Sequence, residues 1–276
     1  MDKKRVILKI VFVVMILAAV GCLGGIGYTV YKYESSKQEY SELNEYVLVE
    51  KQETKTVTDV QEQTPVEEPE EEKEPQYTVE VDFDMDYEAL KAINEDFVGW
   101  LFYEGADISY PVVLDKGTNY YENHSFEKKS NSSGAIFMDY VCKTNLTSFN
   151  TIIYGHNMRN GTMFAFLNDL LEDTSVIDSY PYFYIFTKDK ILMYKIVSGY
   201  HTTKNNKTYD ISLDMTLEDM KAYVEYMDEV SEFRDEEFFG KDVCEEMKLC
   251  TLSTCNGHNT ENRSVIHGEL VATKER

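Results

Sequence analysis

The chain has 276 residues and a formal net charge of −23, from 50 acidic and 27 basic side chains. A chain this acidic repels a phosphate backbone, which excludes nucleic-acid binding as its main activity. Its five cysteines are an odd number, so they cannot all be paired in disulfides, and the framework typical of small secreted domains does not fit.

An apolar stretch from about residue 10 to residue 30 follows a basic tip that contains Lys3, Lys4 and Arg5. About 20 apolar residues are enough to cross a bilayer, and basic residues ahead of such a stretch orient the N-terminus toward the cytoplasm. We expect residues 1–31 to be a cytoplasmic tip and an uncleaved signal anchor in the cell membrane, with everything after it outside the cell. A lipidated Cys22 is the alternative, although no leucine precedes it at the expected position.

Residues 32–80 are acidic and repetitive, and they hold three of the five prolines of the chain. Low apolar content, like charges and proline together are typical of a disordered, extended spacer. We expect a linker that gives the following domain reach; an acidic binding tail is the alternative. Residues 81–276 remain, and about 200 residues are enough for one domain with a full core.

Short strands dominate this last segment. Apolar runs and alternating patterns predict strands, in chain order, at residues 97–103, 108–113, 134–138, 151–154, 182–186, 191–200, 247–255 and 263–271. A helical pattern covers residues 87–94. A second helix begins after Thr216, which forms a capping box with Asp219, and a turn or two at residues 231–239 stops at Gly240. Many short strands with inserted helices predict a mostly antiparallel barrel.

Cys255 ends the predicted strand at residues 247–255, and a polar turn leads into the strand that begins at Arg263. An antiparallel return brings Arg263 back beside Cys255. A free cysteine is more often a buried core residue than a reactive one, and Cys250, on the opposite face of the same strand, is interpreted in that way. Arg263 is permanently charged, so it can stabilise an oxyanion; a surface salt bridge is the alternative.

A thiol with an ordinary pKa of about 8.5 needs a partner that exchanges a proton. His156 follows a predicted buried strand, and Gly155 before it allows the turn that would aim the side chain at the strand end. His258 lies only three residues from Cys255 and is the rival. The pattern favours His156, and both remain candidates.

The motif YGHN at residues 154–157, the motif TLSTC at residues 251–255 and Arg263, in this order behind an apolar N-terminal stretch, resemble the sortases. These are membrane-anchored cysteine transpeptidases of Gram-positive surfaces. The sequence GAIFMDY at residues 134–140 and the long helix before the cysteine strand resemble class B. The resemblance covers roughly residues 82–272.

The resemblance implies a mostly β fold, a sortase-like eight-stranded β-barrel with inserted helices after the N-terminal transmembrane helix. It implies that Cys255 is the nucleophile, His156 the general acid and base, and Arg263 the clamp on the oxyanion or substrate. It further implies that Ser253 and Thr254, together with Asn157, bind substrate.

No cluster of metal ligands is apparent in the sequence, and the resemblance implies no cofactor and no metal. Some class B members carry an acidic residue just after the cysteine. Here Asn256 and Gly257 stand in that place, so a nearby carboxylate is not expected to take part.

The implied partners are secreted proteins with a C-terminal sorting signal, cut after threonine through a thioester, and an acceptor amine from a peptidoglycan precursor or a pilin lysine. Two other cell-wall cysteine enzymes, an L,D-transpeptidase and a papain-like hydrolase, are the enzymatic alternatives. The Ser-His-Gly sequence typical of the former is absent. A non-enzymatic anchored adhesin is the third alternative. The sorting pentapeptide and the acceptor stay open.

Overall fold

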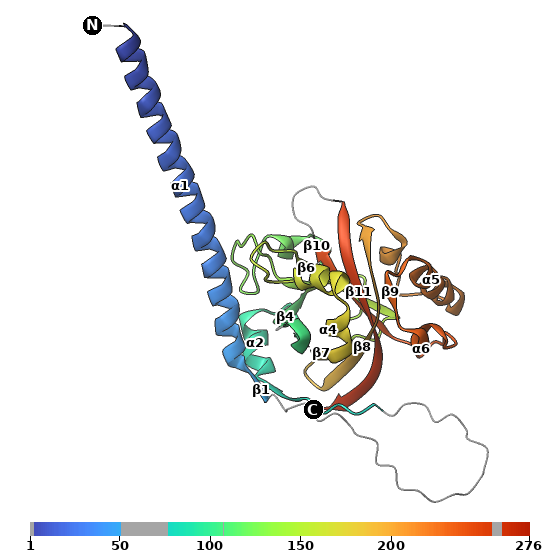
Figure 1. Cartoon of the computed structure of the whole chain (residues 1–276). Coiled ribbons are helices and arrows are strands. Elements are labelled where there is room, and N and C mark those ends of the chain that lie inside the picture. Colours follow the sequence, from blue (N-terminus) through green and yellow to red (C-terminus); the bar gives the residue numbers. More distant parts are fainter. Residues whose placement is uncertain (1–2, 51–76, 107, 256–260) are drawn as a thin grey trace, which may run out of the picture.

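The chain forms a long N-terminal helix and a β-barrel, in a computed structural model that describes residues 3–50, 77–106, 108–255 and 261–276 (Figure 1). Helix α1 (Lys3–Leu43) is followed by a short strand, β1 (Val47–Glu50). Strand β1 pairs antiparallel with β2 (Asp82–Met85), which begins the main part of the chain. The two strands join the end of the helix to the base of the barrel.

Eight strands close into the barrel. They are β3 (Phe97–Tyr103), β4 (Ile108–Leu114), β5 (Ile136–Met138), β6 (Asn150–His156), β7 (Tyr182–Phe186), β8 (Lys190–Thr203), β10 (Leu249–Cys255) and β11 (Asn262–Glu275). The order across the sheet is β11-β10-β6-β5-β4-β3-β7-β8, and pairing of β11 with β8 closes it. The two-residue strand β9 (Phe233–Arg234) extends from β8. The eight-stranded barrel expected from the resemblance is confirmed.

Most neighbouring strands run antiparallel, as the sequence predicts, but two pairs are parallel: β4 with β5 and β6 with β10. The second pair matters for function, because parallel neighbours end at the same edge of a sheet. Strand β11 then returns antiparallel beside β10. The carboxyl ends of β6 and β10 and the start of β11 therefore meet at one mouth of the barrel.

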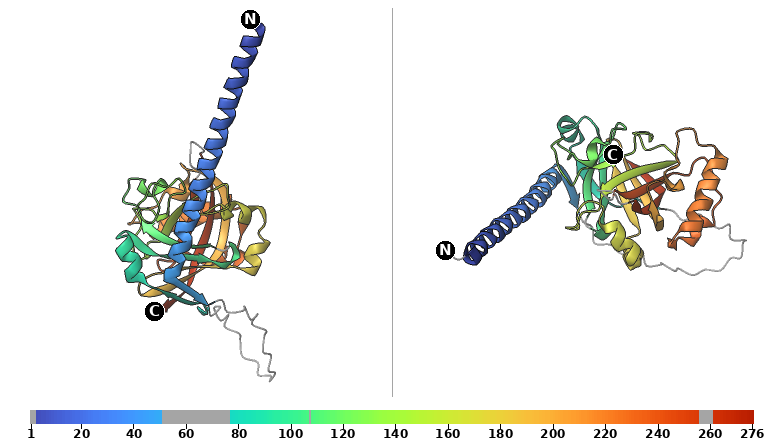
Figure 2. Two further views of the ribbon diagram at one scale, coloured as in Figure 1. Left: turned by 90° about the vertical axis from the view of Figure 1, so that its left-hand side faces the viewer. Right: turned by 90° about the horizontal axis from the view of Figure 1, so that it is seen from above.

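Short helices lie outside the barrel wall. They are α2 (Tyr87–Ile93), α3 (Phe166–Glu172), α4 (Ser175–Ser179), α5 (Leu217–Val230) and α6 (Glu236–Phe239). The predicted capping box of α5 is present, with the Thr216 hydroxyl accepting from the Asp219 N–H at 3.2 Å. Figures 1 and 2 show α5 and α6 on the side of the barrel away from α1. The segment predicted as a turn or two at residues 231–239 contains both β9 and α6.

Helix α1 contains the one segment among the described residues that is long and apolar enough to cross a membrane. Its apolar part projects well beyond the barrel, and the large side chains there are exposed (Figures 1 and 2). An exposed apolar surface of this kind is typical of a helix that lipid surrounds.

The structure differs from the sequence prediction after residue 31. The predicted linker at residues 32–80 begins as the last turns of α1, which continue unbroken to Leu43, and as strand β1. Ser36, Tyr40 and Leu43 are buried against the rest of the chain. Their spacing of four and three residues puts them on one helix face, and this contact overrides the polar composition of the segment. Residues 77–80 of the predicted linker form neither helix nor strand, although Val79 is buried, and residues 51–76 lie outside the described part of the chain.

Candidate active site

The backbone register aligns the three predicted catalytic positions on neighbouring strands. Cys255 at the end of β10 pairs directly with His156 at the end of β6. On the other side of β10, Ser253 pairs with Val265 of β11, and continuing this register by two residues brings Cys255 opposite Arg263. Adjacent strands lie about 4.8 Å apart. Cys255 is therefore between His156 and Arg263 in one row across the mouth of the barrel.

Gly155 allows His156 to reach this row. A Cβ atom at Gly155 would lie 2.6 Å from the Phe164 ring and 2.6 Å from Ile136, so only glycine fits. The Phe164 N–H donates to the His156 carbonyl at 2.9 Å, which fixes the end of β6 against the following loop. Gly155 lies within β6, so packing requires the glycine here, and the turn expected from the sequence is absent at this position.

His156 is half-buried, and its Nε2 lies 2.7 Å from the carbonyl oxygen of Glu122. A carbonyl can only accept a hydrogen bond, so Nε2 carries a proton in this geometry. The ring is then oriented with a defined tautomer in its neutral form, in which Nδ1 is the nitrogen able to accept a proton. A base held in one orientation in this way can assist a neighbouring nucleophile.

Gly134 supports the same ring from the side. Its φ is +59°, a left-handed conformation that favours glycine. A Cβ atom here would lie 2.9 Å from the Glu122 carbonyl oxygen and 3.0 Å from Cδ2 of His156. The absence of a side chain at Gly134 is what lets Glu122 and His156 meet.

Arg263 is the second residue of β11, and its guanidinium donates to the carbonyl of Asn262 at 2.9 Å. It lines a cleft of about 340 Å³ together with Glu122 and an aromatic wall of Phe137, Tyr154 and Tyr209. Tyr154 stacks on Tyr209, with ring centroids 6.2 Å apart. The cleft joins a charged donor to a wall on which an extended peptide can pack.

The structure places the predicted substrate-binding residues differently from one another. Ser253 and Thr254 are fully buried: the Ser253 hydroxyl bonds to that of Tyr209 at 2.8 Å, and the Thr254 hydroxyl accepts from the Ser264 N–H at 2.9 Å. Both are engaged inside the protein, so their geometry favours support of the cleft over contact with a substrate. Asn157 is exposed beside His156.

The other described histidines have positions that suit structure. His124 stacks on Tyr120, His201 pairs with Glu232, and His267 is buried between the barrel wall and helix α5. Burial lowers the pKa of His267 to about 3, which keeps it neutral. The rival base His258, like Asn256 and Gly257, lies within residues 256–260, outside the described part of the chain.

Two of the remaining cysteines are core residues. Cys250 is fully buried, as predicted, and burial raises its pKa well above the usual range. Burial likewise raises the pKa of Cys142 to about 12. A thiol held in this state is a poor nucleophile. Cys22 and Cys244 are exposed, but neither is beside a histidine in the strand register.

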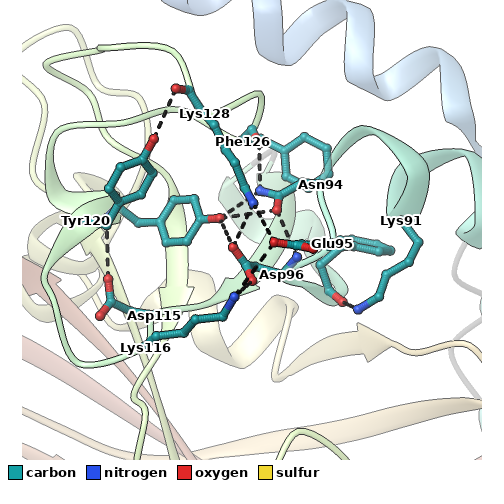
Figure 3. A network of polar contacts seen from close by, with 11 residues as sticks. Lys91, Asn94, Glu95, Asp96, Asp115, Lys116, Tyr120, Phe126 and Lys128 are labelled. Atoms are coloured by element: carbon teal, nitrogen blue, oxygen red, sulfur yellow. Dashed lines mark hydrogen bonds and ion pairs between the residues drawn. The ribbon is translucent and has the colours of Figure 1, made fainter.

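The loop that supplies the Glu122 carbonyl is fixed by a polar network around Asp96 (Figure 3). Lys116 contacts the Asp96 carboxylate at 2.6 Å, Lys128 at 3.1 Å, and the Tyr121 hydroxyl donates to it at 2.7 Å. Burial acts to raise the pKa of Asp96, but these three donors lower it to about 2. The carboxylate therefore stays charged and anchors the loop on both sides of Glu122.

Sequence reasoning missed these supporting residues. Glu122 acts through its backbone carbonyl, which no side-chain pattern reveals, and Asp96 lies 60 positions before the histidine that it indirectly supports. The glycine of the GAIFMDY segment, Gly134, was visible in the sequence, although not its contact with His156. Among the described residues, no group of three or more histidine, cysteine or acidic side chains is arranged to hold a metal ion.

Comparisons with known proteins agree with this geometry. Residues 104–271 match the family model described as a Sortase domain. The chain is 32% identical to sortase B of Listeria monocytogenes over 185 residues, which cover 66% of this chain and 72% of that protein.

Two solved structures have the same fold. A Staphylococcus aureus sortase B–substrate complex superposes with a TM-score of 0.61 at 27% identity, covering 67% of this chain and 84% of that one. Sortase B from Bacillus anthracis superposes with a TM-score of 0.65 at 25% identity, covering 90% and 100%.

Proposed function

The chain belongs to the sortase family, as a cysteine transpeptidase of class B, and from this premise we propose that it cuts a C-terminal sorting motif of secreted proteins after threonine and joins the acyl fragment to an amine of the cell wall or of a pilin. The observation that carries the proposal is the strand register, in which Cys255 pairs with His156; continued two residues past its last pair, Ser253 with Val265, the register of β10 with β11 brings Cys255 opposite Arg263.

In the first half of the reaction, Nδ1 of His156 takes the proton of the Cys255 thiol, and the resulting thiolate attacks the threonine carbonyl carbon of the sorting motif. The carbonyl oxygen becomes an oxyanion, and Arg263 donates hydrogen bonds to it. Collapse of the tetrahedral intermediate breaks the carbon–nitrogen bond. His156 gives its Nδ1 proton to the departing amine, while Nε2 keeps its bond to the Glu122 carbonyl. A thioester at Cys255 remains.

In the second half, an acceptor amine attacks the thioester. His156 takes the proton from the incoming amine through the same Nδ1, and the amide forms as the Cys255 sulfur leaves. The peptidoglycan precursor or a pilin lysine is the acceptor in this proposal. Because one histidine serves both steps, its fixed orientation matters twice in each cycle.

The cleft beside Arg263 is the proposed groove for the sorting motif. The aromatic rings of Phe137, Tyr154 and Tyr209 give apolar area for a peptide side chain, and Asp139, which accepts from the Tyr154 hydroxyl at 2.8 Å, adds a negative charge at its edge. Ser253 supports this wall from below through Tyr209. The Staphylococcus aureus relative is described in complex with its substrate, which favours a peptide groove in this family.

Membrane attachment is the other part of the proposal. The apolar part of α1 anchors the chain in the cell membrane as a single span, with the basic tip in the cytoplasm and the barrel outside. Residues 1–31 are then the anchor, and residues 81–276 the catalytic domain, to which the last turns of α1 and strand β1 also belong. Secreted substrates and lipid-linked wall precursors both meet the enzyme at this surface.

The test is cleavage of fluorogenic sorting-type pentapeptides by the full-length chain in detergent. We expect at least one peptide of a small library to be cut between threonine and the next residue. Cys255→Ala abolishes this cleavage. Cys244→Ala, which removes another exposed cysteine, leaves the rate unchanged. If the wild-type chain cuts no peptide, or if Cys255→Ala cuts as well as the wild type, the proposed function is wrong.

A further inference from the structure

The last turns of α1 dock on the segment at residues 115–135 that holds His156. This segment, called here the support loop, connects β4 to β5 and contains Glu122 and Gly134. Three residues of the helix contact it. The Tyr40 hydroxyl donates to the Gly134 carbonyl at 2.6 Å, Ser36 accepts from the Asn131 side chain at 3.1 Å, and Glu39 accepts from a backbone N–H at 3.4 Å.

The contact of Tyr40 differs from the other two in its position. The Gly134 carbonyl accepts the hydrogen bond from the Tyr40 hydroxyl. The α-carbon of Gly134 lies against the Glu122 carbonyl and the ring of His156. Ser36 and Glu39 contact the support loop elsewhere. Tyr40, Gly134 and His156 therefore form one short chain of contacts from the anchor helix to the proposed base.

Tyr40 is well suited to hold a fixed position. Its ring is 5% exposed and meets Tyr110 edge to face, with centroids 5.4 Å apart. The Tyr110 hydroxyl in turn accepts from the Met163 N–H at 3.2 Å, in the loop after His156. Burial raises the pKa of Tyr40 well above its usual range, so the phenol stays a donor. Tyr40 thus contacts the support loop directly and the loop after His156 through Tyr110.

The far side of the support loop is already fixed by the Asp96 network (Figure 3). The near side, at Gly134, is fixed by a residue of α1. Apart from the short 3-10 turn Tyr120–Glu122 and one isolated bridge between His124 and Ser130, the loop has no regular secondary structure, so its shape depends on such contacts. Without the Tyr40 hydroxyl, the buried Gly134 carbonyl loses its partner, and the loop gains freedom at the point where it touches His156.

We propose that Tyr40 is a positioning residue for His156, so that the helix that bears the candidate membrane span completes the active site from outside the barrel. This inference rests on the proposed function, in which His156 exchanges the proton. The apolar stretch ends near residue 30, ten positions before Tyr40, or about 15 Å along the helix. Attachment to the membrane and orientation of the base are therefore coupled through one rigid element.

The experiment compares Tyr40→Phe with three controls in the full-length chain in detergent. Tyr40→Phe keeps the ring and its contact with Tyr110 and removes only the hydroxyl. Tyr31→Phe makes the same change at an exposed position of α1. Ser36→Ala and Leu43→Ala loosen the docked end of the helix without touching Gly134. We expect Tyr40→Phe to lower kcat about 10-fold with KM within about twofold, and the three controls to stay within about twofold in kcat.

A second readout needs no substrate. Long-range ¹H–¹⁵N spectra of the His156 ring report which nitrogen carries the proton. The wild type is expected to show protonated Nε2, and Tyr40→Phe to show a shifted or mixed ring signal, with Tyr31→Phe unchanged. These spectra do not depend on cleavage, so they test the role of Tyr40 separately from the proposed function. A wild type that cuts no peptide contradicts the proposed function, and the ring signal still shows whether Tyr40 orients His156.

Two results overturn the inference: a folded Tyr40→Phe chain with the kcat and ring signal of Tyr31→Phe, or an equal loss of kcat in Leu43→Ala and Tyr40→Phe at equal melting temperature. If Tyr40→Phe does not fold, Gly134→Ala perturbs the same chain of contacts from the other side. It is then expected to lower kcat and shift the His156 ring signal, and an unchanged ring signal and kcat in folded Gly134→Ala overturns the inference.

Discussion

Strands β6, β10 and β11 carry two polar rows, an inner one covered by helix α5 and an outer one at the mouth of the barrel. The inner row is Asn150, Thr251 and His267, in which the Thr251 hydroxyl lies 2.9 Å from Asn150 and 2.8 Å from Nδ1 of His267. The outer row is His156, Cys255 and Arg263. Each row places a histidine next to the residue that β10 contributes.

The two rows differ in what surrounds the histidine. Both ring nitrogens of His267 face hydroxyl groups, the second being that of Tyr200 at 3.1 Å, and the ring is fully buried. Hydroxyls can donate or accept, so this environment suits a neutral ring and opposes its protonation. His156 is half-buried and is fixed through one nitrogen by a carbonyl. The surroundings of His267 thus suit a structural role, and those of His156 suit the proton exchange proposed for it.

The largest expected effect on the cleavage rate comes from replacing the histidine of the outer row. His156→Ala removes the acid and base, so the rate of peptide cleavage falls about 1000-fold or more. The melting temperature stays within a few degrees, because the side chain is only half-buried. Initial rates with a fluorogenic sorting-type peptide, together with a thermal melt, measure both.

Two matched variants complete this test. His201→Ala removes an exposed histidine that pairs with Glu232 and is expected to keep the full rate. His258→Ala removes the rival near Cys255 and is expected to keep most of it. Loss of cleavage in His258→Ala with full activity in His156→Ala would reverse the assignment of the base.

A smaller effect is expected at the other end of the outer row. Arg263→Lys keeps the charge but loses the planar fork that reaches an oxyanion, so kcat is expected to fall about 100-fold with little change in KM. Arg234→Lys is the control, because Arg234 forms ion pairs with Asp228 and Glu236 at a distant site. An unchanged cleavage rate in Arg263→Lys would indicate that Arg263 takes no part in the reaction and only forms a surface ion pair.

The smallest effect on activity is expected in the inner row. His267→Gln leaves the rate per folded molecule at pH 7.5 within about twofold, and it changes the pH dependence of stability. Burial lowers the pKa of His267 to about 3, so below about pH 6.5 the unfolded chain binds a proton that the folded chain does not. Wild-type stability therefore falls as pH drops from about 6.5 toward 3.

This loss is about 2 kcal/mol by pH 5, or roughly 4–8 °C in melting temperature for a domain of this size. His267→Gln lacks it, so its melting temperature should fall less between pH 7.5 and pH 5. Parallel melts of both chains at the two pH values measure the difference. An equal fall in both chains would show that His267 is not the titrating group.

The sequence was informative about the outer row because each residue ends or begins a strand. YGHN and TLSTC follow apolar runs, and Arg263 follows a polar turn, so the strand ends and the return of β11 were predictable. The barrel followed from short strands and the family resemblance. The parallel pairing of β6 with β10 was not predictable, because it joins segments about 100 residues apart.

Two parts of the site depend on contacts that side-chain patterns do not encode. The support of His156 comes from a backbone carbonyl, and the polar composition of residues 32–46 concealed a helix whose face docks on the support loop. Ser253 and Thr254 lie next to the nucleophile in sequence, but their hydroxyls are engaged inside the barrel wall. Their position next to Cys255 was predictable from the sequence, but the burial of their hydroxyls was not.

Intact-mass spectrometry of the full-length chain mixed with a cleavable sorting-type peptide tests the central claim most directly, because it detects the thioester itself. The account predicts a covalent adduct of the acyl fragment on Cys255. It is released by hydroxylamine, absent in Cys255→Ala and present in Cys244→Ala. Cleavage of the peptide without an adduct on Cys255, and at an equal rate in Cys255→Ala, would contradict it.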